Sequence, residues 1–218
     1  LLKLAPRLID NCDAADRIAA LCGYLPLALR IAGSTLAVAA DWTPEEYAAL
    51  LADERTRLAA LKREDLSVEA AFILSYSRLD QESPVLQASW RLLGLFPTGS
   101  FSMDAAVSVW GVSEIEGKIR LSALLERSLV EHDPETGRYR LHDLMRLFAQ
   151  ARLDSDTPSV ERQNATERYV RHYLALAQDA WDTKEILTRH DLLENERGNL
   201  LQACDFAVQL QNWNAVLQ

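Results

Sequence analysis

No phosphate-binding loop can be found among the eight glycines of this 218-residue chain. The nearest candidate, Gly111–Lys118, has five residues between its glycines where the motif has four, and Ile119 follows the lysine where serine or threonine should hold Mg²⁺. Ser113 and Glu116 have the spacing of a capping box, which places the second glycine and the lysine inside a helix. No apolar strand pattern ending in acidic residues is present either. We therefore expect that this segment by itself is not an enzyme, and that it neither binds ATP tightly nor hydrolyses it.

Paired cysteines, clustered histidines and long apolar runs are also missing. Cys12, Cys22 and Cys204 make no CxxC pair and lack nearby histidine ligands, which argues against disulfides and structural zinc, so we predict three buried thiols. Because the four histidines are scattered and no serine or cysteine lies in a recognisable nucleophile motif, we predict no catalytic residue and no metal site. Apolar stretches fall short of the roughly 18 residues of a membrane span. No signal peptide is visible, so the sequence predicts a cytoplasmic protein without a membrane partner.

Apolar residues at helical spacing dominate what is present, and a hydrophobic content of 49% is enough for one or two cores. Thr43-Pro44-Glu45-Glu46 is a capping box with proline at the first helical position, and Ser83-Pro84 opens another helix. Lys62–Asp65 is predicted to be a charged linker, with Ser67 as the cap of the next helix. We expect a mainly α fold. Helices are predicted over residues 14–22, 44–61 (with a break near 54), 84–95, 102–110, 114–127 and 192–210, and another runs through residues 169–177. Further helices are predicted to begin at residues 26, 67, 143 and 212.

Composition and turn signals divide the chain into three predicted parts. Residues 1–65 form a helical subdomain, and residues 66–153 form helices followed by a two-stranded wing, which is the order of a winged helix. A polar, proline-containing break at 154–159 opens the third part, residues 154–218. Its paired helices suit the start of a tetratricopeptide-like repeat array that would receive a protein or ligand partner. The alternative is a helical cap on the winged helix.

Positive charge is scarce: 23 lysine and arginine residues face 32 aspartate and glutamate residues, which gives a net charge of −9 and a pI near 5.0. A surface that binds duplex DNA should be basic, because it gains affinity by releasing counterions from phosphates. The expected recognition helix and wing mix both signs, with Lys118, Arg120, Arg127, Arg138 and Arg140 against Glu114, Glu116, Glu126, Asp133 and Glu135. We therefore expect no direct DNA binding.

The segment Cys22-Gly23-Tyr24-Leu25-Pro26 joins two of the expected helices. Gly23 suits the left-handed stop after a helix, and Pro26 suits the first position of the next one. Leu25, which precedes a proline, should be extended. The result is a tight loop with an exposed proline ring, on which a planar base could pack while loop backbone groups meet its polar edge. The alternative is a simple corner between two helices.

A second informative segment, Leu141-His142-Asp143-Leu144, follows a predicted hairpin. Residues 129–131 and 139–141 alternate apolar and polar side chains around a turn at 133–137 that has proline early and glycine late. We predict that His142 is the last strand residue and that Asp143 caps the following helix. An imidazole beside a helix N-terminus can donate to an anion that the backbone dipoles also favour. The alternative is a surface histidine that caps or packs locally.

In this order, the two segments resemble motifs of the NB-ARC family of STAND signalling NTPases, and they are most similar to its bacterial antibiotic-regulatory branch. Tyr24–Leu27 looks like the GLPL motif and Leu141–Asp143 looks like the MHD motif, while Ser75–Leu79 and Arg91–Pro97 look like the start of the family's winged helix. The resemblance covers residues 1–153. Tyr24 stands where the family has glycine, which makes the loop bulkier, and a leucine stands where it has methionine.

The resemblance implies that residues 1–218 are the middle piece of a longer protein, whose upstream phosphate-loop NTPase domain binds ADP or ATP. It also implies that Gly23, Leu25, Pro26 and Leu27 lie at the adenine and that His142 reaches the β-phosphate of ADP. Exchange for ATP would free the winged helix, so that the whole protein regulates transcription and oligomerises when activated. Two other functions stay open: a DNA-binding winged helix, and a helical protein-interaction scaffold without nucleotide contact.

Overall fold

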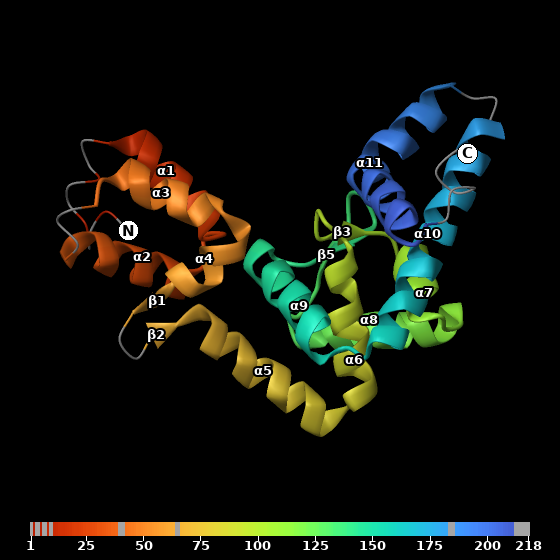
Figure 1. The fold of residues 1–218 in the computed structure, drawn as a ribbon, viewed down its shortest axis with the longest axis horizontal. Helices are drawn as coiled ribbons and strands as arrows, with labels where there is room; N and C mark the ends of the chain where they lie inside the picture. Colours follow the sequence, from red (N-terminus) through yellow and green to blue (C-terminus); the bar gives the residue numbers. More distant parts are fainter. Residues whose placement is uncertain are drawn as a thin grey trace. The chain divides into compact units, whose positions relative to one another are not determined.

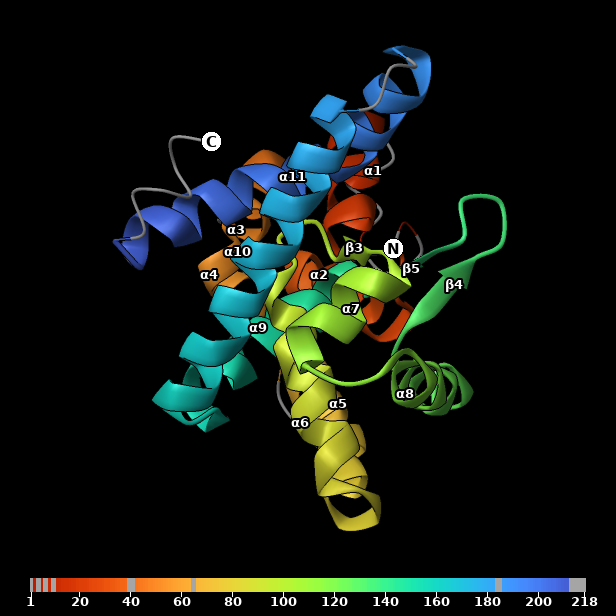
Figure 2. The same cartoon turned by 90° about the vertical axis from the view of Figure 1, so that its right-hand side faces the viewer.

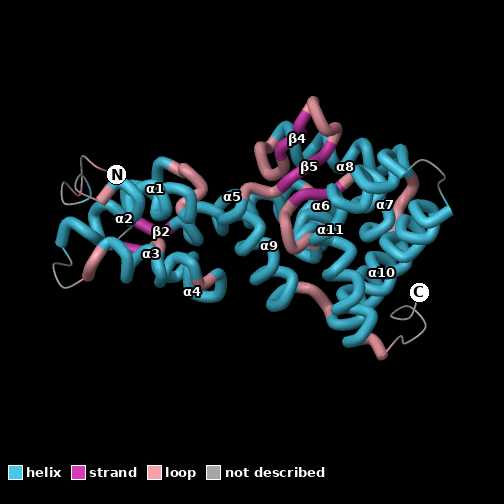
Figure 3. Tube along the Cα trace, turned by 90° about the horizontal axis from the view of Figure 1, so that it is seen from above, coloured by secondary structure: helices cyan, strands magenta, loops and turns pink. Residues whose placement is uncertain are grey.

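The computed structural model describes residues 2, 5, 8, 11–38, 42–63, 66–182 and 186–211 (Figure 1). Helices dominate these residues and the strands are short, as Figure 3 shows, which confirms the predicted mainly α fold. Close contacts divide the chain into an N-terminal unit, residues 1–82 and 143–148, and a C-terminal unit, residues 83–142 and 149–218. The chain therefore changes unit after residues 82, 142 and 148.

Local capping signals set the helix boundaries in the N-terminal unit. The Thr43 hydroxyl accepts from the Glu46 N–H at 3.2 Å, and Glu46 Oε2 accepts from the Thr43 N–H at 2.8 Å, so the predicted capping box is confirmed. Asp53 produces the predicted break, because its Oδ1 accepts from the Arg55 N–H at 3.0 Å and starts a new helix. The elements are α1 (Cys12–Leu21), α2 (Pro26–Val38), α3 (Pro44–Ala52), α4 (Glu54–Ala60), β1 (Lys62–Arg63), β2 (Leu66–Ser67) and α5 (Val68–Glu82).

The predicted charged linker at residues 62–65 is wrong in its described part. β1 and β2 form an antiparallel hairpin in which Lys62 pairs with Ser67 and Arg63 with Leu66. Arg63 Nη1 also donates to the Ser34 carbonyl at 2.9 Å, which holds the hairpin against α2. A tertiary contact therefore orders a segment whose local sequence reads as polar linker. The predicted cap is confirmed, since Ser67 Oγ accepts from the Ala70 N–H at 3.1 Å.

The core of the N-terminal unit lies between these helices and the first turns of α9 (Asp143–Asp156). Phe148 contributes an aromatic contact, with its ring centre 5.7 Å from those of Phe72 and Tyr76. Arg57 is buried, and its guanidinium donates to the carbonyls of Leu51 and Ala52, so it closes the C-terminal end of α3. The largest fully buried side chains of this unit are those of Leu8, Ile18, Ile31, Leu36, Tyr47, Leu51 and Phe148.

The C-terminal unit contains the helix order and three-stranded antiparallel sheet of a winged helix. The strand order is β3-β5-β4, and the register places Phe101 opposite Tyr139 and Tyr139 opposite His132. The predicted wing is confirmed as the β4–β5 hairpin, which Figure 2 shows extending beside α8. The elements are α6 (Pro84–Leu92), the 3-10 turn η2 (Leu93–Leu95), β3 (Ser100–Phe101), α7 (Met103–Trp110), α8 (Glu114–Glu126), β4 (Glu131–Asp133) and β5 (Arg138–Arg140).

Helices α7 and α8 pack closely, and this contact explains the glycine that resembles part of a phosphate loop. Gly117 lies inside α8, as predicted, and any side chain at this position would overlap the Val107 side chain of α7. Ser113 Oγ accepts from the Glu116 N–H at 3.3 Å and starts the helix. Gly111 ends α7 in the left-handed region with φ 67°. These two glycines therefore serve helix ends and helix packing.

Helices α10 (Ser159–Asp182) and α11 (Ile186–Gln209) complete the C-terminal unit. Arg168 donates twice to the Val109 carbonyl, at 2.9 and 2.7 Å, and so joins α10 to the end of α7. The centre of the Tyr169 ring lies 5.3 Å from the centre of the Phe96 ring. Each of the two helices has 24 residues. The pair is therefore longer than one tetratricopeptide repeat, which has roughly 34 residues in its two helices and turn. The repeat array stays a prediction, and the helix expected from residue 212 lies outside the described residues.

Candidate functional site

The loop between α1 and α2 is a hydrogen-bonded helix end followed at once by a helix start. The Gly23 N–H donates to the Ala20 carbonyl at 2.8 Å and the Tyr24 N–H to the Ala19 carbonyl at 3.0 Å, which is the Schellman pattern. The left-handed stop predicted at Gly23 is confirmed by its φ of 59°. Pro26 begins α2, as predicted, and the Leu25 carbonyl accepts from the first complete turn of that helix.

Tyr24 also lies in the left-handed region, with φ 57°, which the sequence did not indicate. The Leu25 N–H donates to the Cys22 carbonyl at 3.2 Å and closes a tight turn around two residues of positive φ. Turns of this kind usually hold glycine, asparagine or aspartate at both central positions. The bulky residue therefore occupies a backbone conformation that glycine would adopt more easily.

Side chains of the loop divide into those that hold it and those that face solvent. Leu25 and Leu27 are half-buried and pack against the core of the N-terminal unit. Tyr24 is 68% exposed and Pro26 is exposed, so the loop presents two rings to solvent. The N–H groups of residues 23–25 donate to the carbonyls of Ala20, Ala19 and Cys22, so a ligand at this loop would meet backbone carbonyl oxygens and not N–H groups. Carbonyl oxygens accept from amino groups, such as the exocyclic amine of an adenine base.

The three cysteines differ in environment. Cys22 is fully buried beneath the loop, and burial raises the pKa of its thiol to about 12, although the positive charge of Arg57 opposes the shift. The predicted buried thiol is therefore confirmed there. The same prediction is wrong for Cys12 and Cys204, which are exposed. A sequence pattern places them on helices but does not decide which helix face is covered.

The wing turn is ordered by one aspartate. Asp133 Oδ1 accepts from the Glu135 N–H at 2.9 Å, and its Oδ2 accepts from the Thr136 hydroxyl at 2.7 Å. These hydrogen bonds, with the Thr136 hydroxyl first, lower the pKa of the exposed Asp133 carboxyl. Gly137 has φ 67° and donates its N–H to the Asp133 carbonyl at 2.8 Å, which closes the turn. The predicted turn at 133–137 is confirmed.

His142 lies just beyond the sheet, and its predicted place as the last strand residue is wrong. β5 ends at Arg140, and the next N–H, that of the buried Leu141, donates to the Gly99 carbonyl at 2.9 Å outside the ladder. Asp143 is the first residue of α9, so the half-buried His142 occupies the position that precedes the helix. An imidazole there still adjoins the positive end of the helix dipole, where an anion is favoured.

The two motif segments lie in different units. Gly23, Leu25, Pro26 and Leu27 share one loop of the N-terminal unit. His142 is the residue at which the chain leaves the C-terminal unit, because Asp143 belongs to the N-terminal unit.

Most basic side chains of the possible DNA-reading face have acidic partners. Lys118 and Arg120 of α8 pair with Glu114 and Glu116 at 2.6 and 2.9 Å. Arg127 donates to a carbonyl of its own helix at 2.9 Å. In the wing, the two arginines pair as Arg140 with Glu131 and Arg138 with Glu196. These contacts add a structural argument to the unfavourable net charge, because the neighbouring carboxylates lower the positive potential of this face.

Sequence reasoning missed a buried polar cluster between the wing and the C-terminal helices. Glu196 of α11 is 2% exposed and accepts from Arg138, from Asn199 Nδ2 at 2.7 Å and from the Tyr173 hydroxyl at 3.2 Å. Arg138 Nε donates to Ser100 Oγ at 2.9 Å, which ties the cluster to β3. No local signal could reveal it, because Arg138 and Glu196 are 58 residues apart.

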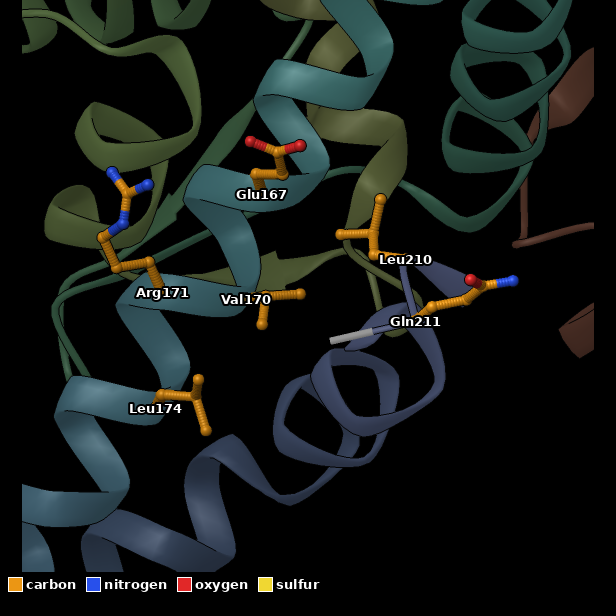
Figure 4. A pocket seen from close by; sticks show the side chains of 6 residues that line it. All are labelled: Glu167, Val170, Arg171, Leu174, Leu210 and Gln211. Carbon is orange, nitrogen blue, oxygen red and sulfur yellow. The ribbon is translucent and has the colours of Figure 1, made fainter. Parts of the chain in front are cut away.

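Two hollows of about 460 Å³ each lie along α10 and α11. One is lined by Val170, Leu174 and Leu210 with charged side chains at its edge, and Figure 4 shows Val170 and Leu174 on the side of α10 that faces the end of α11. The other is mostly apolar and includes Tyr173, Leu174, Ala177, Leu193, Leu200 and Leu201. Neither hollow includes a residue of the two motif segments.

Two kinds of site, for a metal ion and for a membrane span, are absent from the residues that the structure describes. No group of three or more histidine, cysteine, aspartate or glutamate side chains there could hold a metal ion. None of the helices in that part of the chain combines the length and apolar character that crossing a membrane requires.

The fold thus defines a mainly helical protein in which a winged helix follows a helical unit in the sequence. The loop between α1 and α2 of that helical unit exposes the rings of Tyr24 and Pro26. The chain is similar to two proteins called regulatory protein AfsR. It is 43% identical to that of Streptomyces griseus over 166 residues, or 76% of this chain, and 41% identical to that of Streptomyces coelicolor over 176 residues, or 78% of this chain. Each match spans 17% of the relative's length. No protein-family profile and no solved structure matches the chain.

Proposed function

We propose that this chain is the regulatory part of a nucleotide-operated switch in a cytoplasmic protein that controls transcription. The observation that carries the proposal is the loop that presents Pro26, together with His142 at the point where the chain changes unit. The similarity to two proteins named as regulatory proteins supports a regulatory role. The nucleotide itself would be bound by an upstream phosphate-loop domain of the same protein.

In this proposal the loop recognises the base. Pro26 offers an exposed apolar ring and has no N–H to satisfy, while a carbonyl oxygen of the loop, such as that of Tyr24, can accept from an amino group. Leu25 and Leu27 hold the loop against the core. Contact with the base gives affinity for ADP and ATP alike, because the two share it.

His142 distinguishes the two nucleotides. Its imidazole adjoins the start of α9, where a β-phosphate of ADP would receive a hydrogen bond and a favourable helix dipole. ATP places a further phosphate in the same region and rearranges the contact. A ligand shifts a two-state equilibrium only by its difference in affinity for the two states, and a few kcal/mol is enough.

A helical scaffold is the second candidate function, and the apolar hollow beside Tyr173 and Leu200 favours it. Such a scaffold would receive a protein or ligand partner on α10 and α11 without any nucleotide contact at His142. DNA recognition by the winged helix is disfavoured by the ion pairs of α8 and the wing.

Calorimetric titration of two proteins tests the switch: residues 1–218 alone, and the same residues joined to the upstream domain. We expect tight ADP binding only by the longer protein, because the missing phosphate loop supplies most phosphate contacts. Tight, Mg²⁺-dependent ATP binding by residues 1–218 would overturn the proposal. Equal affinity of the upstream domain with and without residues 1–218 would favour the scaffold.

A further inference from the structure

We propose that Tyr24 is a second base-binding residue, whose phenol ring stacks on the nucleobase beside Pro26. The inference rests on the proposed function, since it assumes that this loop meets a nucleotide. It assigns a role to the residue at which the chain departs from the glycine of the GLPL pattern. The chemical group that Tyr24 recognises is the flat face of a purine base.

The backbone gives the first argument. Tyr24 has φ 57° at the second central position of a turn closed by the Leu25 N–H. A bulky residue at positive φ is an outlier, and such strain concentrates at functional sites. Among the described residues, the other non-glycine positions with positive φ are the polar Ser128 and Gln211. Tyr24 is therefore the aromatic exception in a conformation that glycine would take without strain.

The side chain gives the second argument. A residue that follows a Schellman helix end often packs back on the last helical turn, which would give its ring a structural role. Tyr24 instead remains 68% exposed, so most of the ring does not pack on the protein. The strain is thus not offset by burial, which is the usual gain from a large side chain.

The neighbouring groups give the third argument. Pro26 is exposed two residues later, and a loop carbonyl oxygen has two lone pairs, so it can accept from an amino group even where it already accepts one hydrogen bond. Aromatic faces stack on bases of any sequence and contribute substantially to affinity. An exposed phenol, a proline ring and carbonyl acceptors together fit the face and the amino edge of a base.

Stacking on the base affects ADP and ATP equally, which separates this role from that of His142. Replacement of Tyr24 should therefore weaken the binding of both nucleotides by about five- to a hundredfold, which is the range that base–aromatic stacking gives. The ratio of the affinity for ADP to the affinity for ATP should not change. Replacement of His142 should change the ratio. The phenol hydroxyl is not required, so Tyr24→Phe should bind like the parent protein.

The test is calorimetric binding of ADP and of ATP by residues 1–218 joined to the upstream domain, with thermal unfolding of each variant. Tyr24→Gly and Tyr24→Asn both tolerate positive φ and remove the ring. We expect both to lose affinity while the unfolding midpoint of Tyr24→Gly is unchanged or raised. Ser128→Gly is the matched control, because it relieves the same backbone strain at φ 54° and should leave affinity unchanged.

Several results would overturn the inference. If Pro26→Ala weakens binding and Tyr24→Gly does not, the loop meets the base without the phenol, and the proposed function stands. If neither substitution changes the affinity of a protein that binds ADP, the loop does not meet the base and the proposed function fails with the inference. If Tyr24→Gly lowers affinity and the unfolding midpoint together, the ring only supports the loop.

Discussion

Arg138 in the wing and Glu196 in α11 form a buried ion pair that fixes the sheet to the C-terminal helices. The two side chains are 17% and 3% exposed, so neither charge is well solvated. Asn199 and Tyr173 donate to the second carboxylate oxygen, and Ser100 receives a hydrogen bond from Arg138. The wing of this protein is therefore held from within its own unit.

Glu196→Gln should strongly destabilise the C-terminal unit. The substitution keeps the shape of the side chain but leaves Arg138 buried without a counter-charge, and breaking a buried pair in this way costs about 3–5 kcal/mol. Urea unfolding measures the loss. Glu131→Gln is the matched control, because its pair with Arg140 is exposed and should be worth no more than about 1 kcal/mol. Equal effects of the two substitutions would contradict this account.

His142→Ala should speed the release of ADP and raise the basal regulatory output of the full switch. A hydrogen bond to a charged group is worth about 1.5–3 kcal/mol, so loss of the contact should lower the ADP-bound closed population by about tenfold or more. Stopped-flow measurement of ADP off-rates checks this. His132→Ala, in the exposed part of the wing, should leave the rate unchanged. Identical rates for the parent protein and His142→Ala would remove this residue from the site.

Pro26→Ala should weaken the binding of ADP and of ATP roughly fivefold, since an apolar contact worth about 1 kcal/mol is lost. The proline also begins a helix, so its removal can lower stability for a different reason. Pro84→Ala provides the comparison, because Pro84 has the same place at the start of α6. Calorimetry and thermal unfolding of both variants separate the two effects. A loss of stability without a loss of affinity would make Pro26 only a structural corner.

Residues 1–218 should not shift random duplex DNA at moderate salt. The net charge is −9, and Lys118, Arg120 and Arg140 of this face lie in ion pairs with glutamates. A mobility-shift titration with a salt series checks this. The double charge reversal Glu131→Lys and Glu135→Lys should create weak, salt-sensitive binding, which would show that charge is the barrier. Micromolar binding by the unchanged protein would be the opposite result.

The stability of the protein should fall as the pH is lowered below about 6.5, in part because of His172. Burial lowers the pKa of its imidazole, although the negative charges of Glu196 and Asp104 oppose the shift. The unfolded chain therefore takes up this proton at a higher pH than the folded chain, and protonation favours unfolding. Urea unfolding between pH 8 and pH 5.5 should show that His172→Leu loses less stability on acidification than His132→Gln does. The same loss in both variants would assign the effect to other groups.

Signals that act within a few residues predicted much of the fold. The caps at Thr43 and Ser113, the proline at the start of α2 and the turn that ends at Gly137 all lie where the sequence indicated. Their hydrogen bonds join residues close in the chain, so a pattern of residue types is enough to reveal them. The mainly α class follows from the same local periodicity.

Features that depend on distant contacts were not predictable. The β1–β2 hairpin depends partly on the contact between Arg63 and Ser34, and the Glu196 cluster joins three separate stretches of chain. The end of β5 before His142 is set by its partner strand and by the Gly99 carbonyl. For the candidate site, the sequence indicated the loop and its proline but not the conformation of Tyr24.

The contacts of α10 and α11 also determine where this protein can be divided in the laboratory. A piece that stops at residue 153 would lose Tyr169, whose ring covers Phe96, and Arg168, which closes the end of α7. A piece that stops after α10 would still leave Arg138 without Glu196. The shortest piece that retains the complete winged helix therefore runs through α11, well beyond the last strand of its sheet.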